Sequence, residues 1–203
     1  MKSAIALESR VIVHNVYDML MVQDNPKTHQ SDGVEVLASG RFMQMVRDGR
    51  WEYVRRHTCD GAVAVIATTD ADELVLVEQL RVPMGARCLE LPAGLVGDTK
   101  AEKGEAMVTA ARRELLEETG YSATTMELLY PVATSPGLSN EVIDLYRATG
   151  LTEEHNGGGV EHEDIRVHLV KIDEMDAWLA NAREQGLIID AKVYFALAHL
   201  LRA

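Results

Sequence analysis

The 203-residue chain has only two cysteines and no excess of positive charge, and each absence excludes a class of protein. Cys59 and Cys88 are too few for a disulfide framework and lie in no CxxC pair, so we expect two small core or half-buried side chains. The formal net charge of −12 argues against a protein that binds nucleic acid through a basic surface. A small phosphate-bearing substrate is still compatible, because bound divalent cations reverse the local charge.

Long apolar runs are missing as well. No segment approaches the roughly 18 consecutive apolar residues of a membrane-spanning helix. Glu8 and Arg10 interrupt the apolar start of the chain, so no signal-peptide core is expected there. The simplest interpretation is a cytoplasmic protein with no membrane partner. Hydrophobic residues still make up 47% of the chain, which is enough for the core of one domain, or of one domain with a small appendage.

Short β-rich segments occupy most of the chain, and helical patterns are few. The segments 62–68 and 74–79 are joined by a polar turn, as in a β-hairpin. Strands are predicted at 10–22, 34–37, 51–56, 62–68, 74–79, 89–92, 128–133, 142–149 and 165–171, and helices at 105–119, 172–185 and 191–202. Strands followed by one helix, further strands and two last helices indicate a mixed α/β (α+β) class with α/β/α layering.

The helix predicted at 105–119 carries three carboxylates in its second half. Glu114, Glu117 and Glu118 are spaced by three and four residues, so all three lie on one helix face. Anions crowded in this way repel one another unless a cation joins them. Arg113 can pair with Glu117 one turn on, but that offsets only one charge. Hard divalent cations with oxygen ligands suit the remainder. From the glutamates alone, a solvated acidic helix face is the more ordinary interpretation.

An apolar stripe runs beside these carboxylates. Val108, Ala111 and Leu115 form it and are expected to pack on a sheet. The side chain of Glu118 is expected to face solvent and a bound metal ion. Gly120 follows the helix where a left-handed cap is wanted, and so predicts its end.

The residues around the three carboxylates favour a functional site over a solvated helix face. The string from Glu105 to Tyr121, E-x7-R-E-L-L-E-E-T-G-Y, resembles the second part of the Nudix box, G-x5-E-x7-R-E-U-x-E-E-x-G-U, with U aliphatic or aromatic. Every specified position in this stretch is matched. The opening glycine of the box would fall at Thr99, and its nearest counterpart is Gly94. We interpret this difference as a five-residue insertion within 97–103, which alters the loop before the helix and leaves the helix itself intact.

Further segments are similar to those of ADP-ribose pyrophosphatases, a subfamily of the Nudix hydrolases, from roughly Arg50 to the end of the chain. These segments are LVEQLR at 76–81, ELPAG at 90–94, SPG at 135–137, EHEDIRV at 161–167 and DAK at 190–192. The resemblance implies a Nudix α/β/α sandwich at residues 50–203, preceded by an N-terminal β region at 1–49. It also implies a homodimer, with the N-terminal region as the dimerisation element.

The resemblance implies a divalent-metal site that holds Mg²⁺, with Mn²⁺ as the alternative ion. The metal ligands carried over to this chain are the carboxylates of Glu114, Glu118 and Glu163 and the main-chain carbonyl of Ala93. A hard cation with oxygen ligands fits this set. Without the box, the acidic segment 161–164 would be interpreted as a solvated turn.

The resemblance also implies catalytic and substrate-binding residues. The catalytic group comprises Glu161 as general base, Glu117 supporting a metal ion, and Arg113 beside it. Glu161 and Glu163 lie two residues apart, so they can exchange the roles of base and ligand. The substrate-binding group comprises Arg81 on the diphosphate, Glu90 on the nucleoside side, and Gly94.

The reaction implied is the hydrolysis of ADP-ribose to AMP and ribose 5-phosphate. Two alternatives stay open. The first is hydrolysis of another nucleoside diphosphate sugar, because base and sugar contacts are spread over loops. The second is a non-catalytic sensor of ADP-ribose-like ligands, although such modules usually lose one or more of the box glutamates that this chain keeps.

Overall fold

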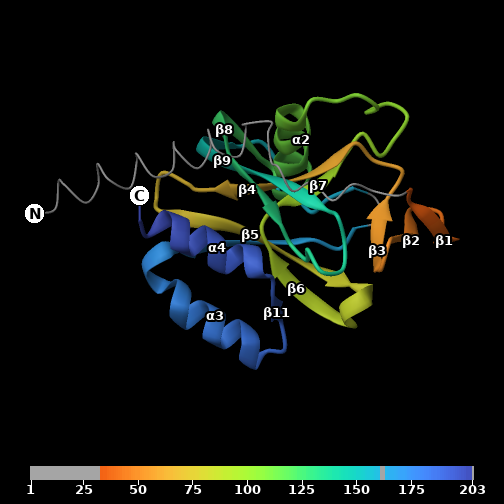
Figure 1. Cartoon of the computed structure of the whole chain (residues 1–203). Helices are drawn as coiled ribbons and strands as arrows, with labels where there is room; N and C mark the ends of the chain where they lie inside the picture. Colours follow the sequence, from red (N-terminus) through yellow and green to blue (C-terminus); the bar gives the residue numbers. More distant parts are fainter. Residues whose placement is uncertain (1–32, 161–162, 203) are drawn as a thin grey trace, which may run out of the picture.

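The computed structural model describes residues 33–160 and 163–202, which form two four-stranded sheets, one three-stranded sheet and three α-helices (Figure 1). The first four-stranded sheet is mixed and has the order β7-β4-β9-β8. Its strands are β7 (Ala93–Val96), β4 (Gly61–Ala67), β9 (Val142–Glu153) and β8 (Tyr121–Ala133).

The second four-stranded sheet has the order β10-β5-β6-β11. Its strands are β10 (Arg166–Lys171), β5 (Glu73–Arg81), β6 (Ala86–Glu90) and β11 (Ile188–Ile189). The helices are α2 (Met107–Thr119), α3 (Met175–Glu184) and α4 (Ala191–Leu200), and two 3-10 turns are η1 (Val82–Met84) and η2 (Ile172–Glu174).

Strand β4 lies at the centre of the core and is buried on both faces. Its residues Val63 and Val65 pack in one hydrophobic cluster with residues of α2, and Ala64 and Ile66 pack in a second cluster with residues of α3 and α4. Helix α2 therefore covers one side of the sheets, while α3 and α4 lie on the opposite side (Figure 1). A strand buried on both faces explains why the sequence here is a continuous apolar run. The predicted α/β/α layering is confirmed.

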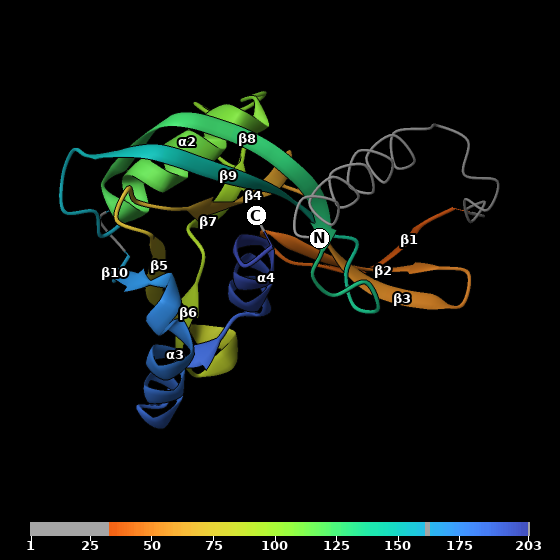
Figure 2. The same cartoon turned by 90° about the vertical axis from the view of Figure 1, so that its left-hand side faces the viewer.

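The three-stranded sheet is formed by β1 (Glu35–Ser39), β2 (Met43–Asp48) and β3 (Trp51–Arg56), and it extends away from the main body (Figure 2). Two contacts join it to the segment before β9. The main-chain N–H of Val54 donates to the carbonyl of Leu138 at 2.9 Å, and Arg56 forms an ion pair of 2.6 Å with Glu141.

Several predicted boundaries differ from the structure. Helix α2 begins at Met107 rather than at residue 105, because Glu105 lies in a turn where its N–H donates to the carbonyl of Glu102. The last long strands are longer than predicted, since β8 begins at Tyr121 and β9 reaches Glu153. Segment 172–185 is divided between η2 and α3, and α4 ends at Leu200.

Strands β2, β7 and β11 were not predicted, and the strand predicted at 10–22 lies outside the described residues. Strand β7 follows Pro92 and contains Gly94, a pattern typical of a turn, yet it pairs along β4. Strand β11 has two residues, too few for any periodicity.

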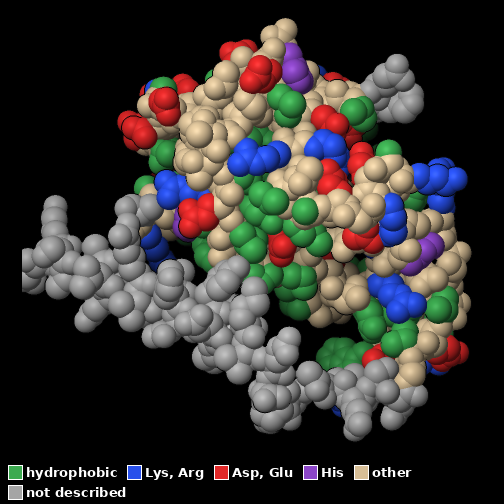
Figure 3. Space-filling view, turned by 90° about the horizontal axis from the view of Figure 1, so that it is seen from above, with side chains coloured by type: hydrophobic (Ala, Val, Ile, Leu, Met, Phe, Trp, Pro, Cys, Tyr) green, Lys and Arg blue, Asp and Glu red, His purple; other side chains and the backbone are tan. Residues whose placement is uncertain are grey.

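None of the helices in the described part of the chain is long and apolar enough to cross a membrane. On the face seen in Figure 3, acidic and basic side chains are intermixed around an apolar centre. Cys88 is buried and Cys59 is half-buried, and neither forms a disulfide, as predicted.

Candidate active site

The end of α2 and the start of β7 meet at two carboxylates. The carboxylate of Glu118 accepts a hydrogen bond of 2.9 Å from the main-chain N–H of Ala93. The carboxylate of Glu114 lies against the next residue, Gly94, where a Cβ atom would stand 1.9 Å from Cδ of Glu114. Only glycine allows so close an approach. The structure thus brings together four of the predicted site residues.

Glu118 is buried, with 4% of its surface exposed, so the expectation that its side chain faces solvent was wrong. It lies seven residues after Ala111, which is two helical turns, and therefore continues the stripe that packs on the sheet. The stripe itself is shifted from the predicted one. Ala110, Ala111 and Leu115 are buried, whereas Val108 is 38% exposed.

Burial makes these two carboxylates unusual acids. Burial raises the pKa of Glu118 to about 8, and the charges of Glu114 and Glu163 act in the same direction. Burial likewise raises the pKa of Glu114 to about 7, although Arg113 opposes the shift. Neighbouring buried carboxylates with raised pKa values are groups that a bound cation would stabilise.

The predicted donor set fits a hard divalent cation by its chemistry, since all of its donors are oxygen atoms of carboxylates and of one main-chain carbonyl. Among the residues that the structure describes, no three His, Cys, Asp or Glu side chains are already grouped closely enough to hold a metal ion. The predicted ligand Glu163 is exposed, and its carboxylate accepts a hydrogen bond of 3.0 Å from the main-chain N–H of Val160.

Arg113 joins the other carboxylates of the helix. Its guanidinium donates to Glu114 at 2.9 Å and to Glu117 at 3.1 Å, which confirms the predicted pairing with Glu117. It also donates to Glu105 and to the carbonyl of Leu95, each at 3.2 Å. Burial alone would lower the pKa of Arg113, but the surrounding carboxylates outweigh it and raise that pKa. Arg113 is thus positioned to hold carboxylates rather than to meet a substrate.

The inserted loop before α2 is bonded to the body of the protein near its C-terminal end and lies close to Asp60 at its start. The carboxylate of Asp60 accepts hydrogen bonds from Lys103 and from the main-chain N–H of Gly104, the latter at 3.1 Å. Gly97 has a left-handed φ of 67°, and a Cβ atom there would overlap the Asp60 carboxylate. Glu102 adds an ion pair of 3.7 Å to Arg113. The sequence predicted the insertion but not these partners, because no local pattern links Asp60 to residues 43 and 44 positions later.

Arg81 and Glu90 lie side by side on the neighbouring strands β5 and β6. The Arg81 guanidinium donates to both carboxylate oxygens of Glu90, at 2.6 and 2.7 Å. Glu90 is buried, while 42% of the Arg81 side chain is exposed. The hydrogen bonds to Glu90 raise the pKa of Arg81, and the negative charge of Glu118 acts in the same direction, so this pair lies near the α2 carboxylates. Two of the three predicted substrate residues, Arg81 and Glu90, are therefore found together.

A glycine-rich segment lies on the C-terminal end of α2. The main-chain N–H groups of Gly158 and Gly159 donate to the carbonyls of Glu118 and Glu117, at 2.9 and 3.0 Å. A Cβ atom on Gly157 would stand 2.5 Å from the carbonyl carbon of Thr119, so glycine permits this contact. The segment that follows therefore starts beside the carboxylate helix. The predicted general base, Glu161, lies outside the described residues.

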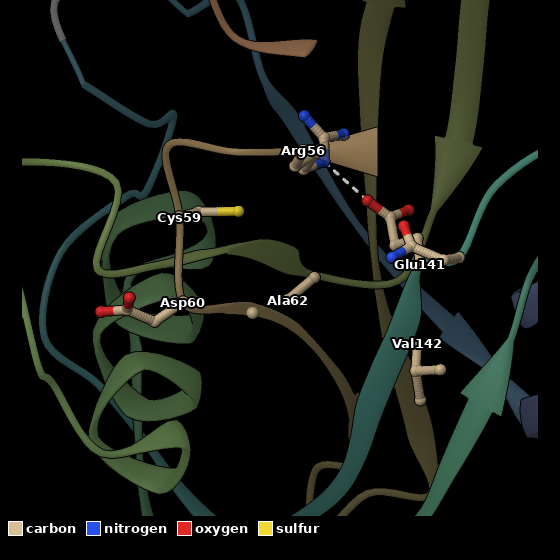
Figure 4. A pocket seen from close by; sticks show the side chains of 8 residues that line it. Arg56, Cys59, Asp60, Ala62, Glu141 and Val142 are labelled. Atoms are coloured by element: carbon tan, nitrogen blue, oxygen red, sulfur yellow. Dashed lines mark hydrogen bonds and ion pairs between the residues drawn. The ribbon is translucent and has the colours of Figure 1, made fainter. Parts of the chain in front are cut away.

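A cavity of about 280 Å³ lies beside the inserted loop (Figure 4). Asp60 and Cys59 line one wall, and the ion pair between Arg56 and Glu141 lines the other. The carboxylates of α2 do not line this cavity, so it is separate from the candidate metal site.

Comparison with known proteins shows the family to which the chain belongs. Residues 60–191 match the model of the NUDIX domain. The chain is 44% identical over 140 residues to a "Methanol dehydrogenase activator" from Bacillus methanolicus, covering 69% of this chain and 71% of that protein. It is 36% identical over 141 residues to an "ADP-ribose pyrophosphatase" from Bacillus subtilis (strain 168), with the same coverage of 69% and 71%.

The fold is also similar to a solved structure. The crystal structure of an "ADP compounds hydrolase" matches with a TM-score of 0.64 and 23% sequence identity, over 87% of this chain and 97% of that one. At this identity the likeness concerns the fold alone.

Proposed function

Since the chain belongs to the Nudix family of pyrophosphohydrolases, we propose that it hydrolyses ADP-ribose to AMP and ribose 5-phosphate. The observation that carries the proposal is the junction of α2 and β7, where Glu118 accepts from the Ala93 N–H and Glu114 lies against Gly94. The sequence segments shared with ADP-ribose pyrophosphatases support this choice among nucleoside diphosphate derivatives, as does the similarity to the Bacillus subtilis protein of that name.

Four groups would hold Mg²⁺, with Mn²⁺ as the alternative ion. These are the carboxylates of Glu114, Glu118 and Glu163 and the carbonyl of Ala93. A bound divalent ion supplies Lewis-acid chemistry, which polarises phosphoryl oxygens and favours a deprotonated water molecule. Arg113 keeps Glu114 and Glu117 in fixed directions through its two hydrogen bonds, and this limits the reorganisation needed when the ligands act.

The remaining roles concern the substrate and the proton. The half-exposed guanidinium of Arg81 would bind the diphosphate, and Glu90 holds that guanidinium in place by two hydrogen bonds. Glu161 would accept the proton of the attacking water as its oxygen bonds to phosphorus and the P–O–P bridge breaks. Glu163 is the alternative base, because it is two residues away on the same segment.

The proposal extends to a homodimer. Several large apolar side chains on β1, β2 and β3 are exposed, namely Val36, Met43, Met45 and Trp51, together with Phe42 in the turn. Apolar side chains gathered on one small sheet suit a protein interface. The dimerisation element proposed for residues 1–49 would therefore act together with β3, which pairs along β2.

A hydrolysis screen with ADP-ribose, UDP-glucose, GDP-mannose and NADH, in Mg²⁺ and then in EDTA, tests the proposed reaction. Metal-dependent release of AMP with ADP-ribose clearly preferred is the expected result. Preference for another diphosphate would contradict the proposed substrate and leave the proposed catalytic roles of the residues unchanged. Absence of hydrolysis with every compound would favour the non-catalytic sensor.

A further inference from the structure

Arg87 in β6 joins a distant residue, Asp164, to the second sheet. Its guanidinium donates to the carboxylate of Asp164 at 2.6 Å and to the main-chain carbonyl of the same residue at 2.9 Å. It also donates to the carboxylate of Glu78, and at 3.1 Å to the Glu78 carbonyl. The Arg87 side chain thus forms hydrogen bonds with both the side chain and the main chain of Asp164.

Glu78 keeps the Arg87 guanidinium in place. Its side chain is buried in β5, and it accepts hydrogen bonds from Arg166 at 3.1 Å and from the ring of His168 at 2.9 Å, both in β10. Strand β5 lies between β10 and β6 in the sheet, so all of these groups meet on adjacent strands (Figure 2). A buried carboxylate with three such donors is a rigid support.

Asp164 directly follows Glu163, and the segment that carries both is bonded at two points. Its first point is the end of α2, where Gly158 and Gly159 donate to main-chain carbonyls. The second point is Asp164 itself, which Arg87 holds by two hydrogen bonds. The residue after Asp164, Ile165, is buried. Glu163 is bonded through the peptide group to Asp164, so a main-chain contact that holds Asp164 limits the positions open to Glu163.

We propose that Arg87 is a positioning residue, which fixes the Glu163 segment against the α2 carboxylates through Asp164. This inference rests on the proposed function, because it gives Glu163 and its neighbours a catalytic task. Displacement of a reacting group by about 1 Å can reduce a rate 100-fold. A support that holds the main chain therefore affects turnover without touching substrate.

An exposed ion pair is the competing interpretation, since 74% of the Asp164 side chain is exposed. Such pairs contribute little to stability. The two interpretations differ in their consequence for catalysis. An ordinary surface pair predicts no change in kcat on removal of the carboxylate, whereas a positioning contact predicts a fall in kcat with KM preserved.

Three variants test the proposal, Asp164→Ala, Asp164→Asn and Arg87→Lys. Asp164→Ala removes the exposed carboxylate and leaves the buried Glu78 with all its donors, so the fold is not at risk. We expect kcat to fall about tenfold with KM within about twofold of wild type. Asp164→Asn keeps an acceptor and should recover part of the loss. Arg87→Lys should lower kcat more, because a lysine ammonium cannot bond the carboxylate and the main-chain carbonyl of Asp164 with the fixed geometry of a guanidinium.

Asp176→Ala, which removes an exposed carboxylate from the first turn of α3, is the matched control and should keep wild-type kcat. The double variant Arg87→Lys with Asp164→Ala should show less than the sum of the two effects, since both substitutions affect the contact between Arg87 and the Asp164 carboxylate. A wild-type kcat in both the folded Asp164→Ala and the folded Arg87→Lys variants, or an equal loss in Asp176→Ala, would overturn the proposal.

Hydrogen exchange of the peptide 157–166 separates this inference from the proposed function. Exchange there should be faster in Asp164→Ala than in wild type, with the rest of the protein unchanged. Hydrogen exchange can be measured even if the wild-type protein hydrolyses none of the diphosphates. That absence of hydrolysis would contradict the proposed function and leave the positioning role of Arg87 untested by kinetics but still tested by exchange. Unchanged exchange of this peptide in both Asp164→Ala and Arg87→Lys would contradict the positioning role, whatever the wild-type activity.

Discussion

Gly94 in β7 lies so close to Glu114 in α2 that a Cβ atom at position 94 would stand 1.9 Å from Cδ of that glutamate. The contact joins β7, which lies close to the proposed substrate residue Glu90 in the chain, to α2, the helix proposed to bind the metal ion. Because Glu114 is also held by Arg113 at 2.9 Å, it has little freedom to move aside.

Gly94→Ala is therefore expected to displace the Glu114 carboxylate and reduce kcat/KM by about 100-fold. The φ of Gly94 is not in the left-handed region, so backbone strain does not add to the effect. The measurement is the rate of ADP-ribose hydrolysis as a function of Mg²⁺ concentration, with the Tm as a check of folding. Gly137→Ala is the control, because no atom would lie within 4 Å of its Cβ. A Gly94→Ala variant as active as Gly137→Ala would contradict the close approach.

Glu118→Gln tests the buried ligand with little change of shape. The amide oxygen of glutamine can still accept the hydrogen bond from the Ala93 N–H, so the Tm should be kept. The loss of the negative charge should lower turnover by about 100-fold or more. Steady-state kinetics with and without added Mg²⁺ provide the measurement. Wild-type turnover in this variant would show that Glu118 is not a metal ligand.

The helix and the central strand could be predicted from the sequence because their signals are local. Helix α2 shows a clear period and ends at Gly120, which adopts the expected left-handed conformation with a φ of 78°. Strand β4 is a continuous apolar run because it is buried on both faces. The start of β8 was missed, since residues near Thr124 are polar and exposed along a strand that pairs with β9.

The site was predicted by motif, while its contacts depend on tertiary structure. The burial of Glu118 was missed because a charged residue is ordinarily exposed, although its position two turns after Ala111 continues the packed stripe. The contact of Arg87 with Asp164 joins residues 77 positions apart, and the support from Glu78 comes from the neighbouring strand β5. Such partners follow from the pairing of β5, β6 and β10, which the sequence alone does not specify.

The inserted loop should affect substrate affinity more than metal dependence. Asp60 holds the loop through Lys103 and Gly104 and also lines the 280 Å³ cavity. Asp60→Asn weakens the bond to Lys103, and we expect KM for ADP-ribose to rise by about threefold to tenfold with the Mg²⁺ requirement unchanged. Asp98→Asn, an exposed change within the same loop, is the control. An unchanged KM in Asp60→Asn and in a variant lacking residues 97–103 would show that the insertion is passive.

The homodimer should depend on the exposed apolar side chains of the three-stranded sheet. Trp51→Asp places a charge on this sheet and is expected to shift the protein towards monomer in sedimentation velocity at micromolar concentration. Leu201→Asp makes the same chemical change at an exposed residue outside that sheet, and it should leave the sedimentation coefficient unchanged. If Trp51→Asp sediments as wild type does, the interface lies elsewhere.

The stability of the metal-free protein should fall as the pH rises through neutrality. The ordinary pKa of a glutamate is 4.5, whereas burial raises that of Glu118 to about 8 and that of Glu114 to about 7. Between the ordinary and the raised values, the folded state binds more protons than the unfolded state, so the free energy of unfolding decreases with increasing pH. In EDTA, the Tm should therefore decline from about pH 5 to about pH 8.

Added Mg²⁺ should reverse this decline, because ionised carboxylates bind the cation and the protonated forms do not. The gain in Tm on adding Mg²⁺ is thus expected to grow with pH over the same window. In Glu118→Gln one of the two titrating groups is gone, so the Tm in EDTA should vary less with pH than in wild type. The measurement is a series of thermal unfolding curves in EDTA and in Mg²⁺. A Glu118→Gln slope equal to that of wild type would mean that Glu118 is ionised in the metal-free protein, and that its burial is compensated by the Ala93 N–H alone.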